Sequence, residues 1–214
     1  KLLQFLSLRT DIFEMDQKTR FLSFYDQTIS IDIDIQSFLK EELGGRRNQI
    51  MDLEEKPFAA GAFGQVYKAK LASGVEIILK VKKKGLKSML VADFLLLKFL
   101  GLLFNIFFEQ RSVNVARTIK EFEETTFKEL DYISEVDNAL YFYETYKGHE
   151  SVVIPKTFKE LSTNNLIIQE YIGGISLSEL IRFKAQGGDY GLWLIENYNT
   201  DPKVFLPNIS YEIM

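Results

Sequence analysis

Residues 56–85 read KPFAAGAFGQVYKAKLASGVEIILKVKKKG, and this stretch decides the fold. It holds two β-rich runs, FGQVYKAKL and VEIILKVKK, joined by ASG, which predicts a β-hairpin with glycine in its turn. Small residues gather just before the first run, where backbone amides could approach phosphate oxygens without obstruction by side chains. By itself the stretch is typical of either a phosphate-binding loop or a hairpin punctuated by glycines.

The small-residue segment matches the glycine-rich loop of protein kinases, GxGxxGxV, in part. Residues 59–66, AAGAFGQV, agree with it at Gly61, Gly64 and Val66 and have Ala59 at the first glycine. Such a match is weak alone, because small-residue hairpins are common.

A lysine in the second run strengthens the match. Lys80 lies in the apolar run IILKV, and removing an ammonium group from water is costly unless anions meet it. In kinases a lysine on this strand binds the α and β phosphates and is positioned by a glutamate of the next long helix. The alternative is a lysine at a strand edge that reaches solvent.

A helical region over residues 115–146 offers acidic candidates. Its apolar residues recur at steps close to 3.6 with one gap at Thr126, which predicts one amphipathic helix or two in sequence. On one regular helix Asp131 and Glu135 would share a face, while Glu129 and Asp131 would diverge. By spacing alone, a solvated acidic face is the commoner explanation of such a run.

Composition excludes several classes of protein. The 214 residues are 46% hydrophobic with a net charge of -4, so the chain is globular and has no extended nucleic-acid footprint. It contains no cysteine and one histidine, which excludes thiolate zinc sites and histidine clusters.

The rest of the chain is read from local signals. Asp34 is a possible cap for the helix IQSFLKEEL, which Gly44 and Gly45 would end. Residues 151–161 and 164–174 are strand candidates. The apolar segment Met89–Phe108 is interrupted by Asp93 and Lys98, so we expect a buried or partner-facing helix, with an interfacial membrane helix as the alternative.

Taken together, these motifs resemble the UbiB family of AarF-type atypical kinase-like proteins. The start KLLQ resembles the family's KxGQ motif at Lys1 and Gln4, with Leu3 in place of glycine. PFAAGAFGQV resembles the alanine-rich loop, ELD resembles the ExD motif, and IIQEYIGG resembles the strand and hinge that meet adenine.

The resemblance implies an α+β fold, a kinase-like N-lobe with a small antiparallel sheet and a long helix. It divides the chain into a helical extension (1–54), a nucleotide-binding lobe with an inserted apolar helix (55–174), and a hinge-following helix with the start of a truncated second lobe (175–214). It implies ATP, with Mg²⁺ bound mainly outside this chain. The nucleotide-binding positions would be Ala59, Ala60, Gly61, Ala62, Phe63, Gly64, Val66, Lys80, Gln169, Glu170 and Tyr171.

The resemblance also implies contacts and partners. Lys80 would pair with Glu135, and Lys1 would pair with Glu129 or Asp131. The catalytic candidates that the resemblance implies are Lys80, Glu135, Glu129 and Asp131. Family function implies a link to ubiquinone biosynthesis or lipid homeostasis, with protein partners of quinone biosynthesis. Expected partners also include a lipid or membrane surface at 89–108, and the expected location is cytoplasmic, peripheral at a bacterial or organellar inner membrane.

Some kinase parts are not recognisable in the sequence. No catalytic-loop Asp and Asn or DFG-type Asp is found, so we read the chain as a fragment at both ends and leave its turnover open. Three interpretations remain: the ATP-binding part of a UbiB-like kinase or ATPase, a noncatalytic kinase-like module that binds a protein or lipid through its apolar helix, and an ordinary protein kinase lobe. Ala59, ELD and KLLQ weigh against the last.

Overall fold

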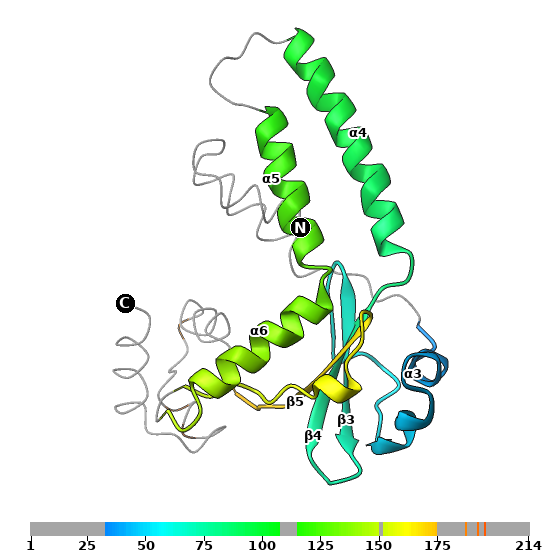
Figure 1. Cartoon of the computed structure of the whole chain (residues 1–214), viewed down its shortest axis with the longest axis vertical. Helices are drawn as coiled ribbons and strands as arrows, with labels where there is room; N and C mark the ends of the chain where they lie inside the picture. Colours follow the sequence, from blue (N-terminus) through cyan, green and yellow to red (C-terminus); the bar gives the residue numbers. More distant parts are fainter. Residues whose placement is uncertain are drawn as a thin grey trace. The chain divides into compact units, whose positions relative to one another are not determined.

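The computed structural model describes residues 33–107, 115–149 and 152–174, together with residues 187, 192 and 195. The chain divides into two compact units, Lys1–Tyr171 and Ile172–Met214, and the elements of Figure 1 named here lie in the first. They are α3 (Ile35–Leu43), the 3-10 helix η1 (Gly44–Gln49), β1 (Ile50–Met51), β2 (Ala59–Ala60), β3 (Gly64–Leu71), β4 (Glu76–Lys82), α4 (Leu86–Phe107), α5 (Val115–Lys128), α6 (Tyr132–Thr145), the 3-10 helix η2 (Lys159–Leu161) and β5 (Leu166–Glu170).

The sheet is antiparallel, with strand order β1-β3-β4-β5 and β2 paired to β3. The predicted hairpin is present as β3 and β4, and Gly74 in its turn has φ +88°, a conformation that favours glycine. Val66 lies opposite Lys80 on β3, and Ile167 lies opposite Lys80 on β5.

The two faces of the sheet differ in character because side chains alternate along each strand. On β4, Ile77, Leu79 and Val81 are buried, and they join α3 in the main hydrophobic core. The core is completed by Ile35, Leu39, Leu43, Ile50, Tyr67, Ala69, Phe158, Leu161, Leu166 and Ile168. The other face carries Lys80 and Lys82, and there a smaller cluster joins α6 to Ile167.

Helix α3 begins and ends where the sequence predicted. The Asp34 carboxylate accepts a hydrogen bond from the Ser37 backbone N–H at 3.0 Å, and Gly44 ends the helix. Arg47 holds the following turn by donating to the Ile50 carbonyl and to the Gln36 side chain.

The second helical region consists of two helices rather than one. Helix α5 ends at Lys128, and α6 begins after Asp131, whose carboxylate accepts from the Ser134 backbone N–H at 3.0 Å and from the Ser134 hydroxyl at 2.7 Å. The idea that Asp131 and Glu135 share the face of one helix is therefore wrong, because Asp131 caps the helix that carries Glu135.

The strand candidate over residues 151–161 is also wrong in its described part. Only Thr157 makes an isolated bridge, to Gln169, and η2 follows directly. Pro155 lacks the N–H group that a ladder needs. The second candidate is confirmed as β5.

Helices α4 and α5 lie side by side (Figure 1). Phe94 of α4 packs edge-on against Phe122 at a ring distance of 5.2 Å, and it also contacts Phe127. A Cβ at Gly101 would lie 2.8 Å from Ile119, so the small residue lets the helices approach closely. In the described part of the chain, no helix is long and apolar enough to cross a membrane.

We predict that the Asp131 cap makes α6 sensitive to acid. Hydrogen bonds from Ser134 lower the pKa of Asp131, so its stabilising contribution is complete above its unfolded pKa and is lost as pH falls below about 4. Asp131→Ala should lower the thermal unfolding midpoint at pH 7 and lower it less at pH 3. Asp93→Ala, at an exposed position of α4, is the control, and an Asp131→Ala effect equal at both pH values would contradict the prediction.

A second prediction concerns the two glycines of the loop. A Cβ at Gly64 would lie 2.5 Å from the Val81 backbone oxygen, whereas a Cβ at Gly61 would meet only the Gly64 oxygen at 3.8 Å. Gly64→Ala should therefore cost about 1–3 kcal/mol of unfolding free energy. Gly61→Ala should change it by less than about 0.5 kcal/mol. Urea unfolding of both variants measures the difference, and equal losses would refute the steric explanation.

Candidate functional site

The ammonium group of Lys80 and the carboxylate of Glu135 form the centre of the candidate site. Lys80 Nζ donates to Glu135 Oε1 at 2.6 Å and to Oε2 at 2.9 Å, across 55 residues of sequence. Their side chains are 37% and 40% exposed, so both remain accessible to a ligand. The contact expected between these two residues is present, while its role in binding a nucleotide stays a prediction.

The small-residue segment forms a tight hairpin beside this pair. Ala59 and Ala60 make β2, and Gly61 N–H donates to the Gly64 carbonyl at 2.8 Å. Phe63 holds the next segment by accepting from the Lys83 N–H at 3.0 Å. Ala59, Gly61 and Ala62 are exposed, so the backbone of the turn is open to a ligand.

Half-buried side chains surround Lys80 on its face of the sheet. Val66 and Ile78 are only partly covered, and both alternate with residues of the main core. An apolar surface beside a paired lysine is what a base or sugar ring and its phosphates would require.

The predicted hinge is less open than expected. Glu170 N–H donates to the Lys156 carbonyl at 2.8 Å, and Tyr171 N–H donates to the Glu76 carbonyl at 2.9 Å. Gln169 donates through its side chain to Thr157 at 2.9 Å. The two backbone donors are thus engaged within the protein, and an adenine ring would have to meet other groups there.

An aromatic contact lies next to the hinge. The Lys68 ammonium is 4.1 Å from the centroid of Phe58 and 4.2 Å from that of Tyr171, and the two rings meet edge-on. Attraction between the cation and both rings ties the segment before the loop to the end of β5.

The acids of ELD occupy the turn between α5 and α6. Glu129 follows the end of α5 and is exposed, and Asp131 is used as the cap. Their expected contact with Lys1 cannot be followed, since Lys1 and Gln4 lie outside the described residues. In the described ranges no three His, Cys, Asp or Glu side chains gather as a metal site.

Lys82 and Tyr132 belong to the same region and were missed in the sequence. Lys82 Nζ donates to the Leu130 carbonyl at 2.6 Å and to the Asn164 carbonyl, and burial lowers its pKa while Asp131 opposes that change. The signal that could have found Lys82 is its two-residue spacing from Lys80, which places both on one face.

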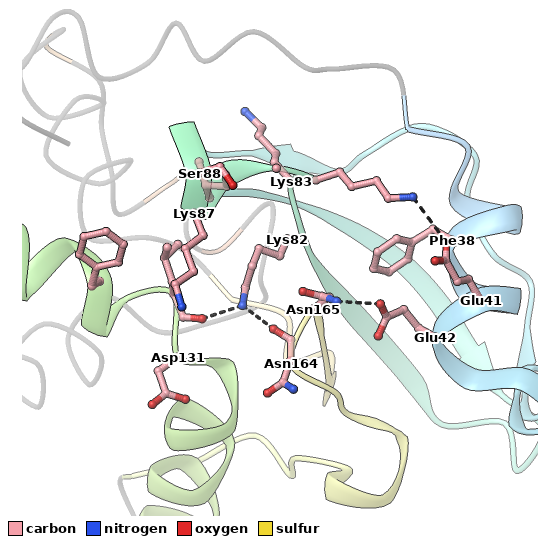
Figure 2. Close-up of a pocket in the computed structure, with 15 residues that line it drawn as sticks. Phe38, Glu41, Glu42, Lys82, Lys83, Lys87, Ser88, Asp131, Asn164 and Asn165 are labelled. Carbon is pink, nitrogen blue, oxygen red and sulfur yellow. Dashed lines mark hydrogen bonds and ion pairs between the residues drawn. The ribbon is translucent and has the colours of Figure 1, made fainter. Parts of the chain in front are cut away.

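Lys82 lines a hollow of about 690 Å³. Figure 2 shows its side chain among the others that line this hollow. Residues from α3, the β4-α4 turn, the α5-α6 turn and the segment before β5 line it. Asn165 donates to Glu42 across it, at 2.8 Å, and basic side chains include Lys83 and Lys87. The residues that line this hollow do not include Lys80 or Glu135, so we place the candidate site on the pair and not in this hollow.

Comparison with known proteins identifies the family. Residues 26–190 match the ABC1 atypical kinase-like domain. The chain is 30% identical over 188 residues to the "Probable protein kinase UbiB" of Aliivibrio fischeri, covering 86% of this chain and 35% of the relative. It is 29% identical over 190 residues to the "Protein ACTIVITY OF BC1 COMPLEX KINASE 3, chloroplastic" of Arabidopsis thaliana, covering 87% of this chain and 27% of the relative. The chain thus spans about a third or less of the length of these relatives.

A solved structure supports the fold. The complex of Rv3197 with erythromycin from Mycobacterium tuberculosis aligns with a TM-score of 0.56 and 24% identity, covering 85% of this chain and 46% of that one. The kinase-like N-lobe predicted from the sequence is confirmed, and so is the resemblance to UbiB and AarF-type proteins. Because the domain matches residues 26–190, most of the chain, this chain belongs to the ABC1 atypical kinase-like family.

Proposed function

We propose that this chain forms the ATP-binding part of a UbiB-like atypical kinase or ATPase linked to ubiquinone biosynthesis or lipid homeostasis. The observation that carries the proposal is the ion pair between Lys80 of β4 and Glu135 of α6, at 2.6 Å. In kinases this pair must be in place for the lysine to hold the α and β phosphates.

The residues around the pair fit a triphosphate. Lys80 supplies a cation that Glu135 orients, and the exposed backbone from Ala59 to Ala62 can approach phosphate oxygens closely. Val66 and Ile78 provide an apolar surface for the nucleoside. Family membership suggests Mg²⁺ as well, which would neutralise phosphate charge, and its ligands would come from outside the described residues.

The loop combines alanine and glycine. A Cβ at Gly61 would make only an ordinary van der Waals contact with the Gly64 oxygen, at 3.8 Å, so an alanine there would meet no steric obstacle in the protein itself. We propose that Gly61 lets phosphates approach more closely than an alanine would, and that nucleotide affinity falls in Gly61→Ala although stability does not.

We predict that Lys80→Ala weakens ATP binding about tenfold or more, because a hydrogen bond to a charged group is lost. The measurement is a titration of the intact protein with ATP, with and without Mg²⁺. Lys70→Ala is the matched control, since Lys70 lies on β3 and pairs with Asp52 instead. Unchanged affinity in Lys80→Ala would remove the proposal.

A second candidate function comes from the surface of α4. Leu95, Phe99 and Leu102 are 63%, 56% and 58% exposed and follow one another along one side of the helix. The neighbouring stripe of the helix, with Phe94 and Gly101, packs on α5. Helix α5 carries charged residues, so the pair of helices is apolar on one side and polar on the other.

We propose that this side of α4 lies on a membrane surface with anionic lipids. Charge favours that occupant: Lys83, Lys84 and Lys87 precede the exposed stripe, and Lys83 and Lys87 have no carboxylate partner in the described ranges. Basic residues next to an apolar helix face are attracted to anionic headgroups. Protein partners of quinone biosynthesis are the other occupants that the family suggests.

We predict that Phe99→Glu lowers the partition of the intact protein onto phosphatidylcholine vesicles containing phosphatidylglycerol about tenfold or more, since an apolar side chain is replaced by a charge. Flotation assays measure it, and Val153→Glu, at a position that is also exposed, is the control. Binding should also fall with salt. Equal flotation of Phe99→Glu and the unaltered protein would exclude a membrane on this face and leave a protein partner.

A further inference from the structure

Tyr132 is the first residue of α6 and is 1% exposed. Its hydroxyl is a buried polar group that has no hydrogen-bond partner in the described part of the protein. Burial also raises the pKa of Tyr132, which keeps the hydroxyl neutral. A tyrosine whose hydroxyl is unused must be held there by contacts of its ring.

The ring of Tyr132 contacts two cations. Its centroid lies 4.3 Å from Lys82 Nζ and 5.1 Å from Lys80 Nζ. These lysines project from the same face of β4, so their charges repel each other across a short distance. The negative face of an aromatic ring attracts both ammonium groups.

The other end of Tyr132 reaches the loop. A Cβ built on Gly64 would lie 3.0 Å from the Tyr132 hydroxyl oxygen, which places the hydroxyl directly against the glycine. The side chain therefore extends from the two lysines to the last glycine of the small-residue hairpin.

Lys82 fixes the same end of α6. Its ammonium donates to the Leu130 carbonyl, just before the helix, and to the Asn164 carbonyl, just before β5 (Figure 2). Glu135 follows Tyr132 by three residues, so the two share a side of α6. The position of Tyr132 therefore determines where the Glu135 carboxylate stands relative to Lys80.

From these contacts we infer that Tyr132 is a positioning residue of the candidate nucleotide site. Its ring attracts the ammonium groups of both Lys80 and Lys82 and keeps the start of α6 in register with β4, so that the Lys80–Glu135 pair is set before a nucleotide enters. The inference rests on the proposed function for the role of the pair, and on the observed distances for the contacts themselves. The ring is the active part, and the hydroxyl is dispensable.

The test compares Tyr132→Phe, which keeps the ring, with Tyr132→Leu, which removes it. Tyr141→Leu on the same helix is the matched control, since Tyr141 is 69% exposed. ATP affinity of the intact protein should fall about tenfold in Tyr132→Leu, by loss of the contacts with both cations. It should stay within about threefold of the unaltered protein in Tyr132→Phe and Tyr141→Leu.

A spectroscopic measurement is independent of nucleotide binding. With ¹³C-dimethylated lysines, assigned through Lys80→Arg and Lys82→Arg, the signals of both residues should be shifted upfield by the ring in the unaltered protein and in Tyr132→Phe. Unshifted signals in the unaltered protein would overturn the inference even where Tyr132→Leu does not fold.

The two measurements separate the inference from the proposed function. Shifted lysine signals without any ATP binding would reject the proposed function and support the ring contacts. ATP binding that is equally strong in folded Tyr132→Leu, or equally weakened in Tyr132→Phe, would reject the positioning role while leaving the nucleotide site intact.

Discussion

An ammonium group in the middle of an apolar strand has to be matched by negative charge, and this requirement organises the described part of the protein. Lys80 is matched by Glu135, which is brought from 55 residues away by α6. For that, α6 must start at a fixed point, and the Asp131 cap and the contacts of Lys82 define it. It must also rest on the sheet, which it does through Tyr132, Val136 and Ile167. Each of these features makes sense as support for one half-exposed ion pair.

The sheet serves two purposes because its faces are unequal. Its α3 side is a closed hydrophobic core that supplies stability. Its α6 side is only partly covered, and there polar and apolar groups lie together. A rigid core behind an incompletely covered face is a common way to hold a binding site precisely without filling it.

Short-range patterns predicted much of this arrangement. The hairpin, the Asp34 cap and the choice of Lys80 and Glu135 as partners follow from turn residues, alternation and motif spacing. The sequence allowed either one helix or two over residues 115–146. An aspartate within a helical pattern is typical of a surface position, and only its hydrogen bond with Ser134 identifies Asp131 as the cap of a second helix. The strand assigned to residues 151–161 was wrong because its apolar residues were given more weight than the N–H donor that Pro155 lacks.

Long-range contacts account for what the sequence did not reveal. Neither Tyr132 nor Lys82 was a candidate in the sequence, since nothing local indicates that one ring will contact two lysines of one strand. The engagement of Glu170 and Tyr171 N–H groups likewise depends on partners far away in the chain. The KLLQ motif and residues 175–214, apart from the single residues 187, 192 and 195, lie outside the residues that the structure describes.

The alternation of β4 has a consequence for how the strand pairs. A slip of one residue against β3 or β5 would turn Lys80 and Lys82 into the closed core against α3 and expose Ile77, Leu79 and Val81. Both changes are costly, so Lys80 and Lys82 also discriminate against misregistered sheets. A substitution of both by apolar residues would do more than remove the ion pair with Glu135: it would leave β4 with two similar faces and remove much of what selects one pairing.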